Sequence, residues 1–142
     1  VMISGGSYGG YMTALALTYG AEYFQYGYAK FGVMDWMLYD SHYTERYMDL
    51  PKDNPEGYKA ASVFTYLDRY QSCGPAMLRI VHGMMDDNVH MQNSMQLVDA
   101  LQQINRKFEL MLFPGERHGW MKKMKFTLED LKDFKNRYLK RK

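Results

Sequence analysis

The stretch that decides the fold is residues 1–19, VMISGGSYGGYMTALALTY. The apolar residues at its start predict a short strand over residues 1–4, and the apolar spacing that follows predicts a helix over residues 8–19. Between the two lies Gly5-Gly6-Ser7-Tyr8-Gly9, which fits the pattern Gly-x-Ser-x-Gly. In this pattern a serine occupies a sharp strand-to-helix turn that exposes its hydroxyl group. We expect the two outer glycines to be required because a Cβ atom at either would strike the neighbouring strand or helix.

The rest of the chain continues to alternate strands with helices. We expect strands over residues 24–31, 76–82 and 107–113. We expect one helix over residues 90–104 and a last helix that begins at a capping box at Thr127 and runs through Leu139. An excursion over residues 34–75 is expected to carry binding residues on two short helical pieces, SHYTERYM and PEGYKAAS. Because strands alternate with helices, the sequence predicts an α/β fold with a mostly parallel sheet and helices on both faces.

Composition excludes several classes of protein. The 142 residues are enough for one domain with a sizeable core. Cys73 is the single cysteine, so the chain can form neither an internal disulfide nor a cysteine-rich zinc site. A net charge of +2 is too small to attract nucleic acid, so we expect no nucleic-acid partner. No apolar run approaches the roughly 18 residues that a membrane span needs.

The serine turn predicts a catalytic group that other strands must complete. A serine hydroxyl is a weak nucleophile at neutral pH, so it needs a base and a group that orients the base. Asp86 follows the strand expected over 76–82, and His118 follows the strand expected over 107–113. The order serine, acid, histidine is that of α/β-hydrolases, whose sites form at the carboxyl ends of the strands. We further expect the backbone N–H of Tyr8, at the helix start, to face a developing oxyanion.

Each assignment has an alternative. His82 ends an apolar strand and is expected to be a hydrogen-bonded core residue, whereas His42 lies in the helical excursion and His90 begins an amphipathic helix. Asp87 competes with Asp86 for the orienting role, because sequence spacing alone does not separate them and either could instead cap a helix.

A metal site is the alternative to the serine mechanism. The side chains that could in principle converge on one ion are His82, Asp86, Asp87 and His90. That interpretation leaves the serine turn unexplained. We therefore expect neither a metal ion nor another cofactor.

Several strings resemble one known family. GGSYGGYMT, DSHYTERYM and HGMMDDNVH, together with His118-Gly119, are similar to the catalytic domain of the prolyl oligopeptidase family, specifically its dipeptidyl peptidase IV branch. The resemblance runs through nearly the whole chain. It implies a serine exopeptidase whose substrates are peptides with proline near the N-terminus. It also implies that residues 1–142 are the C-terminal part of an α/β-hydrolase catalytic domain, with upstream strands and a propeller domain expected before Val1.

The resemblance assigns roles to individual residues. It implies that Ser7 is the nucleophile, Asp86 the orienting acid and His118 the general base. The substrate-binding residues that it implies are an aromatic wall around the proline ring, a valine that helps to close it and an amide that holds a substrate carbonyl: Trp36, Tyr39, Tyr43, Val89 and Asn88. A proline ring is flat, apolar and without an N–H, so aromatic faces suit it. Ordinary packing is the alternative for these aromatic residues, since the chain has 13 tyrosines.

The chain also departs from the family pattern. Gly6 stands where many relatives have tryptophan, which loosens one packing contact without touching the nucleophile. The family's second oxyanion donor, an upstream tyrosine, and the paired glutamates that bind the substrate amine have no counterpart in these residues. Losing one oxyanion donor costs on the order of 10² to 10³ in rate, so we expect the isolated chain to be inactive or nearly so.

Other properties stay open at this point. An esterase of the same fold and a non-catalytic interaction module are the alternative functions, because a fold does not dictate its chemistry. The choice between dipeptide and tripeptide release depends on the amine-binding part. The resemblance suggests a periplasmic, secreted or membrane-anchored protein, and it allows a homodimer through the C-terminal helix.

Overall fold

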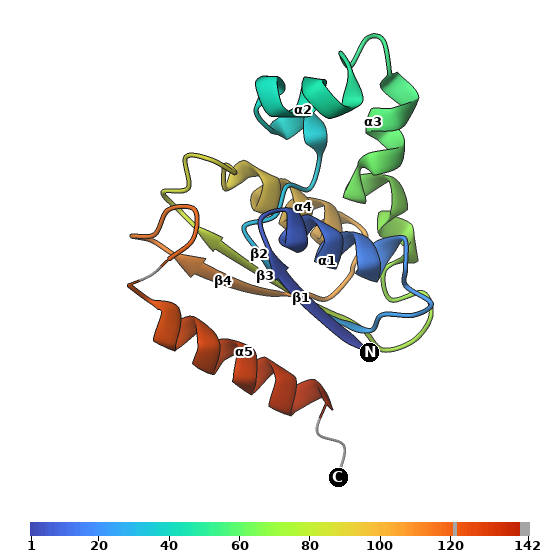
Figure 1. Cartoon of the computed structure of the whole chain (residues 1–142). Helices are drawn as coiled ribbons and strands as arrows, with labels where there is room; N and C mark the ends of the chain where they lie inside the picture. The colour runs from blue at the N-terminus through green and yellow to red at the C-terminus, as the bar shows by residue number, and fades with distance from the viewer. Residues whose placement is uncertain (121, 140–142) are drawn as a thin grey trace.

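The computed structural model describes residues 1–120 and 122–139. At its centre lies a sheet of four parallel strands in the order β1-β2-β3-β4 (Figure 1). The strands are β1 (Met2–Gly6), β2 (Tyr26–Lys30), β3 (Met77–Gly83) and β4 (Glu109–Phe113). The predicted α/β class and the parallel sheet are confirmed, with strand ends that differ from the expected ones by up to two residues.

Helices cover both faces of the sheet. The first helix, α1 (Tyr8–Thr18), and α4 (Gln92–Gln103) lie on one face, and α5 (Met124–Leu139) lies on the other (Figure 1). Successive residues of β3 serve the two cores, since Ile80 packs in the cluster with α1 and α4 while Val81 packs in the cluster with α5. A strand buried on both faces explains the dense apolar run that this part of the sequence shows.

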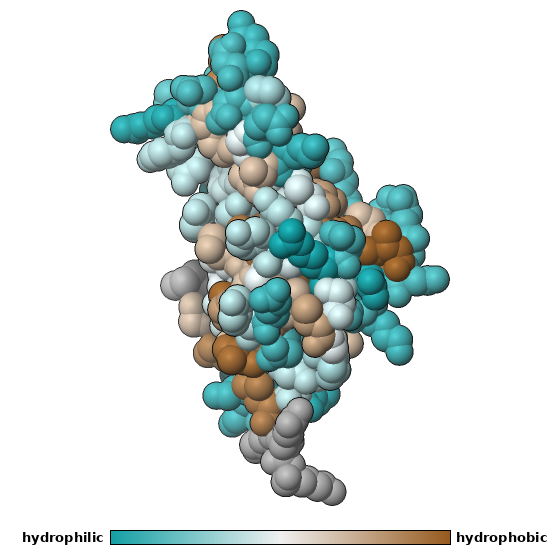
Figure 2. All heavy atoms as spheres, turned by 90° about the vertical axis from the view of Figure 1, so that its right-hand side faces the viewer, coloured by the Kyte–Doolittle hydropathy of each residue, from teal (hydrophilic) through white to brown (hydrophobic). Residues whose placement is uncertain are grey.

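The segment between β2 and β3 forms the predicted excursion. Its elements are the 3-10 turns η1 (Trp36–Leu38) and η2 (Val63–Arg69) and the helices α2 (Ser41–Met48) and α3 (Pro55–Ala61). The side chains of Asp40 and Asn54 accept hydrogen bonds from the first turns of α2 and α3, which fixes where these helices begin. The excursion projects away from the sheet, and its outer end is mostly polar (Figure 2). None of the described helices is long and apolar enough to cross a membrane.

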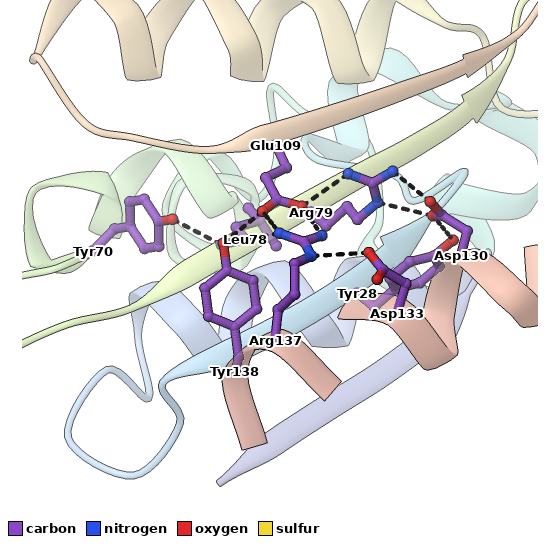
Figure 3. Close-up of polar contacts among 9 residues, drawn as sticks. All are labelled: Tyr28, Tyr70, Leu78, Arg79, Glu109, Asp130, Asp133, Arg137 and Tyr138. Atoms are coloured by element: carbon purple, nitrogen blue, oxygen red, sulfur yellow. Dashed lines mark hydrogen bonds and ion pairs between the residues drawn. The ribbon is translucent and has the colours of Figure 1, made fainter. Parts of the chain in front are cut away.

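A network of ion pairs holds α5 against the sheet (Figure 3). Arg79 on β3 pairs with Glu109 on β4 at 2.8 Å and with Asp130 on α5 at 2.6 Å. Arg137, also on α5, donates to Glu109 at 2.9 Å, and the Tyr28 hydroxyl donates to Asp130 at 2.6 Å. Burial raises the pKa of the Glu109 carboxyl, but the hydrogen bonds from its partners, Arg137 first among them, lower that pKa to about 2.

The start of α5 differs from the sequence prediction. The helix begins at Met124, so the capping box expected at Thr127 is wrong. The hydroxyl of Thr127 donates to the carbonyl of Lys123 at 3.0 Å and accepts the indole N–H of Trp120. Both bonds are possible because Thr127 already lies in the first turn, where its hydroxyl bonds back along the helix and links the preceding loop to α5.

Candidate active site

Ser7 lies alone between the end of β1 and the start of α1. Its backbone has φ 56° and ψ −119°, a strained conformation for a residue with a side chain. Backbone hydrogen bonds hold the turn on both sides of Ser7: its N–H donates to Lys30 O on β2 at 3.0 Å, and its carbonyl accepts from Gly10 N on α1 at 2.9 Å. A strained residue that is fixed from both sides is typical of the turn expected from the Gly-x-Ser-x-Gly pattern.

The glycines around Ser7 only partly match the expectation. A Cβ atom on Gly5 would lie 2.5 Å from the backbone of Gly9, so glycine is required there. A Cβ atom on Gly9 would have no heavy atom within 4 Å, and the prediction for that position is wrong. The second tight position is Gly10, where a Cβ atom would lie 2.4 Å from Lys30 O. Glycine is thus required at position 10 and not at position 9, because α1 crosses the end of β2 at Gly10.

The structure brings Ser7, His118 and Asp86 together. The Nε2 atom of His118 lies 3.0 Å from Ser7 Oγ, although 111 residues separate them in the sequence. The Nδ1 atom of His118 lies 2.9 Å from Asp86 Oδ2. The three residues follow β1, β4 and β3, so parallel strands deliver all of them to the same edge of the sheet.

The carboxylate of Asp86 is buried and well supplied with donors. Its Oδ1 atom accepts from the backbone N–H groups of Asn88 at 3.0 Å and Val89 at 2.9 Å. Burial raises the pKa of this carboxyl, but hydrogen bonds from His82, from His118 and from the Asn88 N–H together hold the pKa below its ordinary value. Asp86 is therefore ionised at neutral pH and can stabilise a positive charge on His118.

The position of Asp87 separates it from its neighbour. Its side chain is exposed and pairs with the exposed Arg117. The structure thus places Asp86, and not Asp87, against the imidazole of His118.

The other histidines lie away from the serine. His82 is fully buried, with Nδ1 at 2.7 Å from Ser94 Oγ and Nε2 at 2.7 Å from Val89 O, as expected for a hydrogen-bonded core histidine. His42 and His90 are exposed. Within residues 1–120 and 122–139, no group of three or more histidine, cysteine or acidic side chains is arranged to hold a metal ion.

The start of α1 offers a backbone donor beside Ser7. Tyr8 is the first residue of the helix, where backbone N–H groups lack partners in the preceding turn. In the part of the chain that the structure describes, no acceptor takes the N–H of Tyr8. The positive end of the helix dipole lies at the same place, which favours a negative charge there.

Aromatic side chains gather next to this turn. The rings of Trp36, Tyr39 and Tyr43 lie within 5.4 to 6.1 Å of one another, and the ring of Tyr8 lies 6.0 Å from that of Trp36. The Tyr39 hydroxyl donates to Asn88 Oδ1 at 2.7 Å, which connects the excursion to the loop that carries Asp86.

A cavity of about 460 Å³ opens beside these rings. Its lining residues are Tyr8, Tyr11, Trp36, Tyr43, Thr44, Tyr47, Met48 and Ala61. The predicted residues Tyr39, Asn88 and Val89 do not line it, and Val89 is fully buried in the core. Sequence reasoning missed Tyr47, whose spacing of four residues from Tyr43 on α2 places both on one side of the helix.

Phe31 is a second residue that sequence reasoning missed. It follows β2, and the centroid of its ring lies 4.6 Å from that of His118. The carboxyl ends of all four strands therefore supply residues to this site.

Comparisons with known proteins identify the family of this chain. The model of the prolyl oligopeptidase family matches residues 1–142. The chain belongs to the prolyl oligopeptidase family. A relative from Neurospora crassa named "Probable dipeptidyl-aminopeptidase B" is 47% identical over 119 residues, which are 82% of this chain and 13% of the relative. A relative of the same name from Arthroderma gypseum is 45% identical over 121 residues, which are 84% of this chain and 13% of the relative.

Solved structures of this family also match. The crystal structure of Porphyromonas gingivalis dipeptidyl peptidase 4 superposes with a TM-score of 0.83 at 39% identity, covering 92% of this chain and 18% of that one. The predicted family and the predicted α/β-hydrolase fold are therefore confirmed. The chain spans less than a fifth of the length of each of these family members.

Proposed function

We propose that this chain carries the catalytic residues of a serine exopeptidase that releases dipeptides from peptide N-termini, cleaving after proline. The observation that carries the proposal is the pair of short contacts that His118 makes, 3.0 Å to Ser7 Oγ and 2.9 Å to Asp86 Oδ2. These are the contacts that a general base needs on its two nitrogens. The dipeptidyl-peptidase names of the relatives support the release of two residues.

The reaction follows from these contacts. Ser7 Oγ attacks the substrate carbonyl while His118 Nε2 takes its proton, which gives a tetrahedral oxyanion. His118 then returns the proton to the leaving amine, and an acyl-enzyme forms on Ser7. Water, activated by the same imidazole, hydrolyses the ester bond and restores the serine.

Two further groups lower the barrier. The N–H of Tyr8 donates to the oxyanion, at the positive end of the α1 dipole. Asp86, buried and ionised, keeps the proton of neutral His118 on Nδ1, so that Nε2 is free to accept from Ser7. The carboxylate also stabilises the imidazolium that forms in the transition state.

The aromatic group beside Ser7 supports selectivity for proline. Trp36 and Tyr43 line the cavity and lie with their rings stacked, 6.1 Å apart. Flat apolar faces bind a pyrrolidine ring without leaving a substrate N–H unsatisfied. Because Asn88 Oδ1 accepts from Tyr39, its amide NH₂ stays available to donate to a substrate carbonyl.

The test uses the full-length natural protein. A fluorophosphonate probe is expected to label Ser7 and to leave the Ser7→Ala variant unlabelled. A Gly-Pro reporter is expected to be cleaved in preference to a Gly-Leu reporter with the same leaving group. Labelling at another residue would contradict the mechanism, and a preference for neutral esters over the Gly-Pro reporter would contradict the substrate class.

A further inference from the structure

We propose that Phe31 is a positioning residue for His118, and that its ring fills the space that the glycine at position 6 leaves open. The proposal rests on the role of His118 under the proposed function. It goes beyond that function because it assigns the orientation of the imidazole to a residue outside the serine, histidine and aspartate group.

Phe31 is held firmly by its surroundings. Its backbone has φ 36°, an uncommon conformation for a residue with a bulky side chain, and its N–H donates to Val81 O at 2.7 Å. Its ring meets the imidazole of His118 at 66°, with centroids 4.6 Å apart, and meets the indole of Trp120 at 84° and 4.9 Å. The ring of Phe31 therefore packs against both the imidazole and the indole.

The imidazole needs such a contact. Its two hydrogen bonds leave from Nδ1 and Nε2, on opposite sides of the ring, and do little to stop the ring from tilting about the line that joins them. A packed ring against the imidazole resists that tilt. The support continues behind Phe31, because Trp120 is hydrogen-bonded to Thr127 on α5, and α5 is fixed to the sheet by the ion pairs of Arg79 and Glu109.

Gly6 is what makes room for the ring. A Cβ atom on Gly6 would lie 2.8 Å from Phe31 Cζ and 3.0 Å from Cε2. A large side chain at position 6, such as tryptophan, would need the same space. One large side chain fits in this space. In this chain it is Phe31, which follows β2, and the neighbouring position at the end of β1 is glycine. A tryptophan at position 6 would fill the same space from β1.

The inference is tested by three variants of the full-length protein assayed with the Gly-Pro reporter. Phe31→Leu removes the ring, and Gly6→Ala displaces it. Each is expected to lower kcat by about 10-fold to 100-fold, because an imidazole misplaced by about 1 Å costs on that order. KM is expected to stay within about twofold, since Phe31 and Gly6 do not line the cavity that Trp36 and Tyr43 line.

The third variant, called the exchange variant, places the large side chain at position 6 and a small one at position 31. Gly6→Trp combined with Phe31→Ala is expected to recover kcat to within about fivefold of the natural protein, which a merely additive pair of damaging substitutions would not do. Phe24→Leu serves as the matched control, because Phe24 precedes β2, at the opposite end of that strand from Phe31, and packs in the cluster with α1. It is expected to change kcat by less than twofold.

The outcomes separate this inference from the proposed function. A natural protein that neither labels nor cleaves the reporter would overturn the proposed function itself. An active natural protein whose folded Phe31→Leu variant keeps kcat within twofold would overturn the inference. If Phe31→Leu does not fold, the exchange variant decides: recovered kcat supports the inference, and a folded but slow exchange variant overturns it.

Discussion

Replacing Asp86 with asparagine tests how the acid acts on His118. The new amide keeps an oxygen for the N–H groups of Asn88 and Val89, which Oδ1 now accepts at 3.0 and 2.9 Å. Its NH₂ then faces His118 Nδ1 in place of Oδ2, so Nδ1 must accept and the ring proton moves to Nε2. A protonated Nε2 cannot take the proton of Ser7. We expect kcat on the Gly-Pro reporter to fall by about 10⁴, or about 5 kcal/mol of transition-state stabilisation.

The neighbouring aspartate gives a matched control for this experiment. Asp87→Asn changes the same chemical group one residue later, but Asp87 is exposed and pairs only with Arg117 among the described residues. We expect kcat to change by less than threefold, because exposed ion pairs contribute little. A thermal melt of both variants would establish that they are folded. The reasoning is refuted if folded Asp86→Asn keeps more than a tenth of the natural rate, or if Asp87→Asn is the variant that loses activity.

Three further predictions concern stability and completeness. Gly10→Ala is expected to lower the free energy of unfolding by about 2 kcal/mol or more, since the new Cβ atom would lie 2.4 Å from Lys30 O. Gly9→Ala is expected to be neutral or slightly stabilising, because a Cβ atom there would have no heavy atom within 4 Å. The thermal midpoints of the two variants measure the difference. Glu109→Gln is expected to cost about 2 kcal/mol at pH 7. Because the pKa of Glu109 in the folded state is lowered to about 2 from 4.5, its contribution to stability is present above pH 4.5 and is lost as the pH falls toward 2. Between pH 4.5 and 2, the thermal midpoint of the Glu109→Gln variant should therefore change less with pH than that of the natural protein. An equal pH dependence of the two midpoints would contradict this role of Glu109. The isolated 142-residue chain is expected to cleave the Gly-Pro reporter at least about 10² times more slowly than the full-length protein, because we assign only one oxyanion donor, Tyr8 N–H, within it; equal rates would disprove this.

Much of the site was predictable because chain order and strand ends constrain it. In a parallel sheet, residues that follow the strands lie at one edge, so Ser7, His118 and one of the two aspartates, Asp86 or Asp87, could be placed together from the strand pattern. The choice between Asp86 and Asp87 could not be made from spacing. Successive residues in a loop point in different directions, and only the backbone donors of Asn88 and Val89 fix which carboxylate turns inward.

The expectations that failed depend on contacts between distant segments. The need for glycine at position 10 arises where α1 crosses the end of β2, which no local pattern reveals. Thr127 resembled a helix cap, but its hydroxyl binds Trp120 and Lys123 within the first turn of α5. Phe31 read as the last residue of an aromatic-rich strand, and only the fold shows that its ring lies against His118.

The placement of the aromatic group has a consequence for substrate choice. Trp36, Tyr39 and Tyr43 lie on the excursion between β2 and β3, whereas Ser7, Asp86 and His118 lie in the turn and loops that follow β1, β3 and β4. Under the proposed function, substitutions in this insertion could alter the choice of substrate while Ser7, Asp86 and His118 keep their arrangement. The exception is the 2.7 Å hydrogen bond from Tyr39 to Asn88, because a substitution of Tyr39 would remove a contact of the loop that carries Asp86.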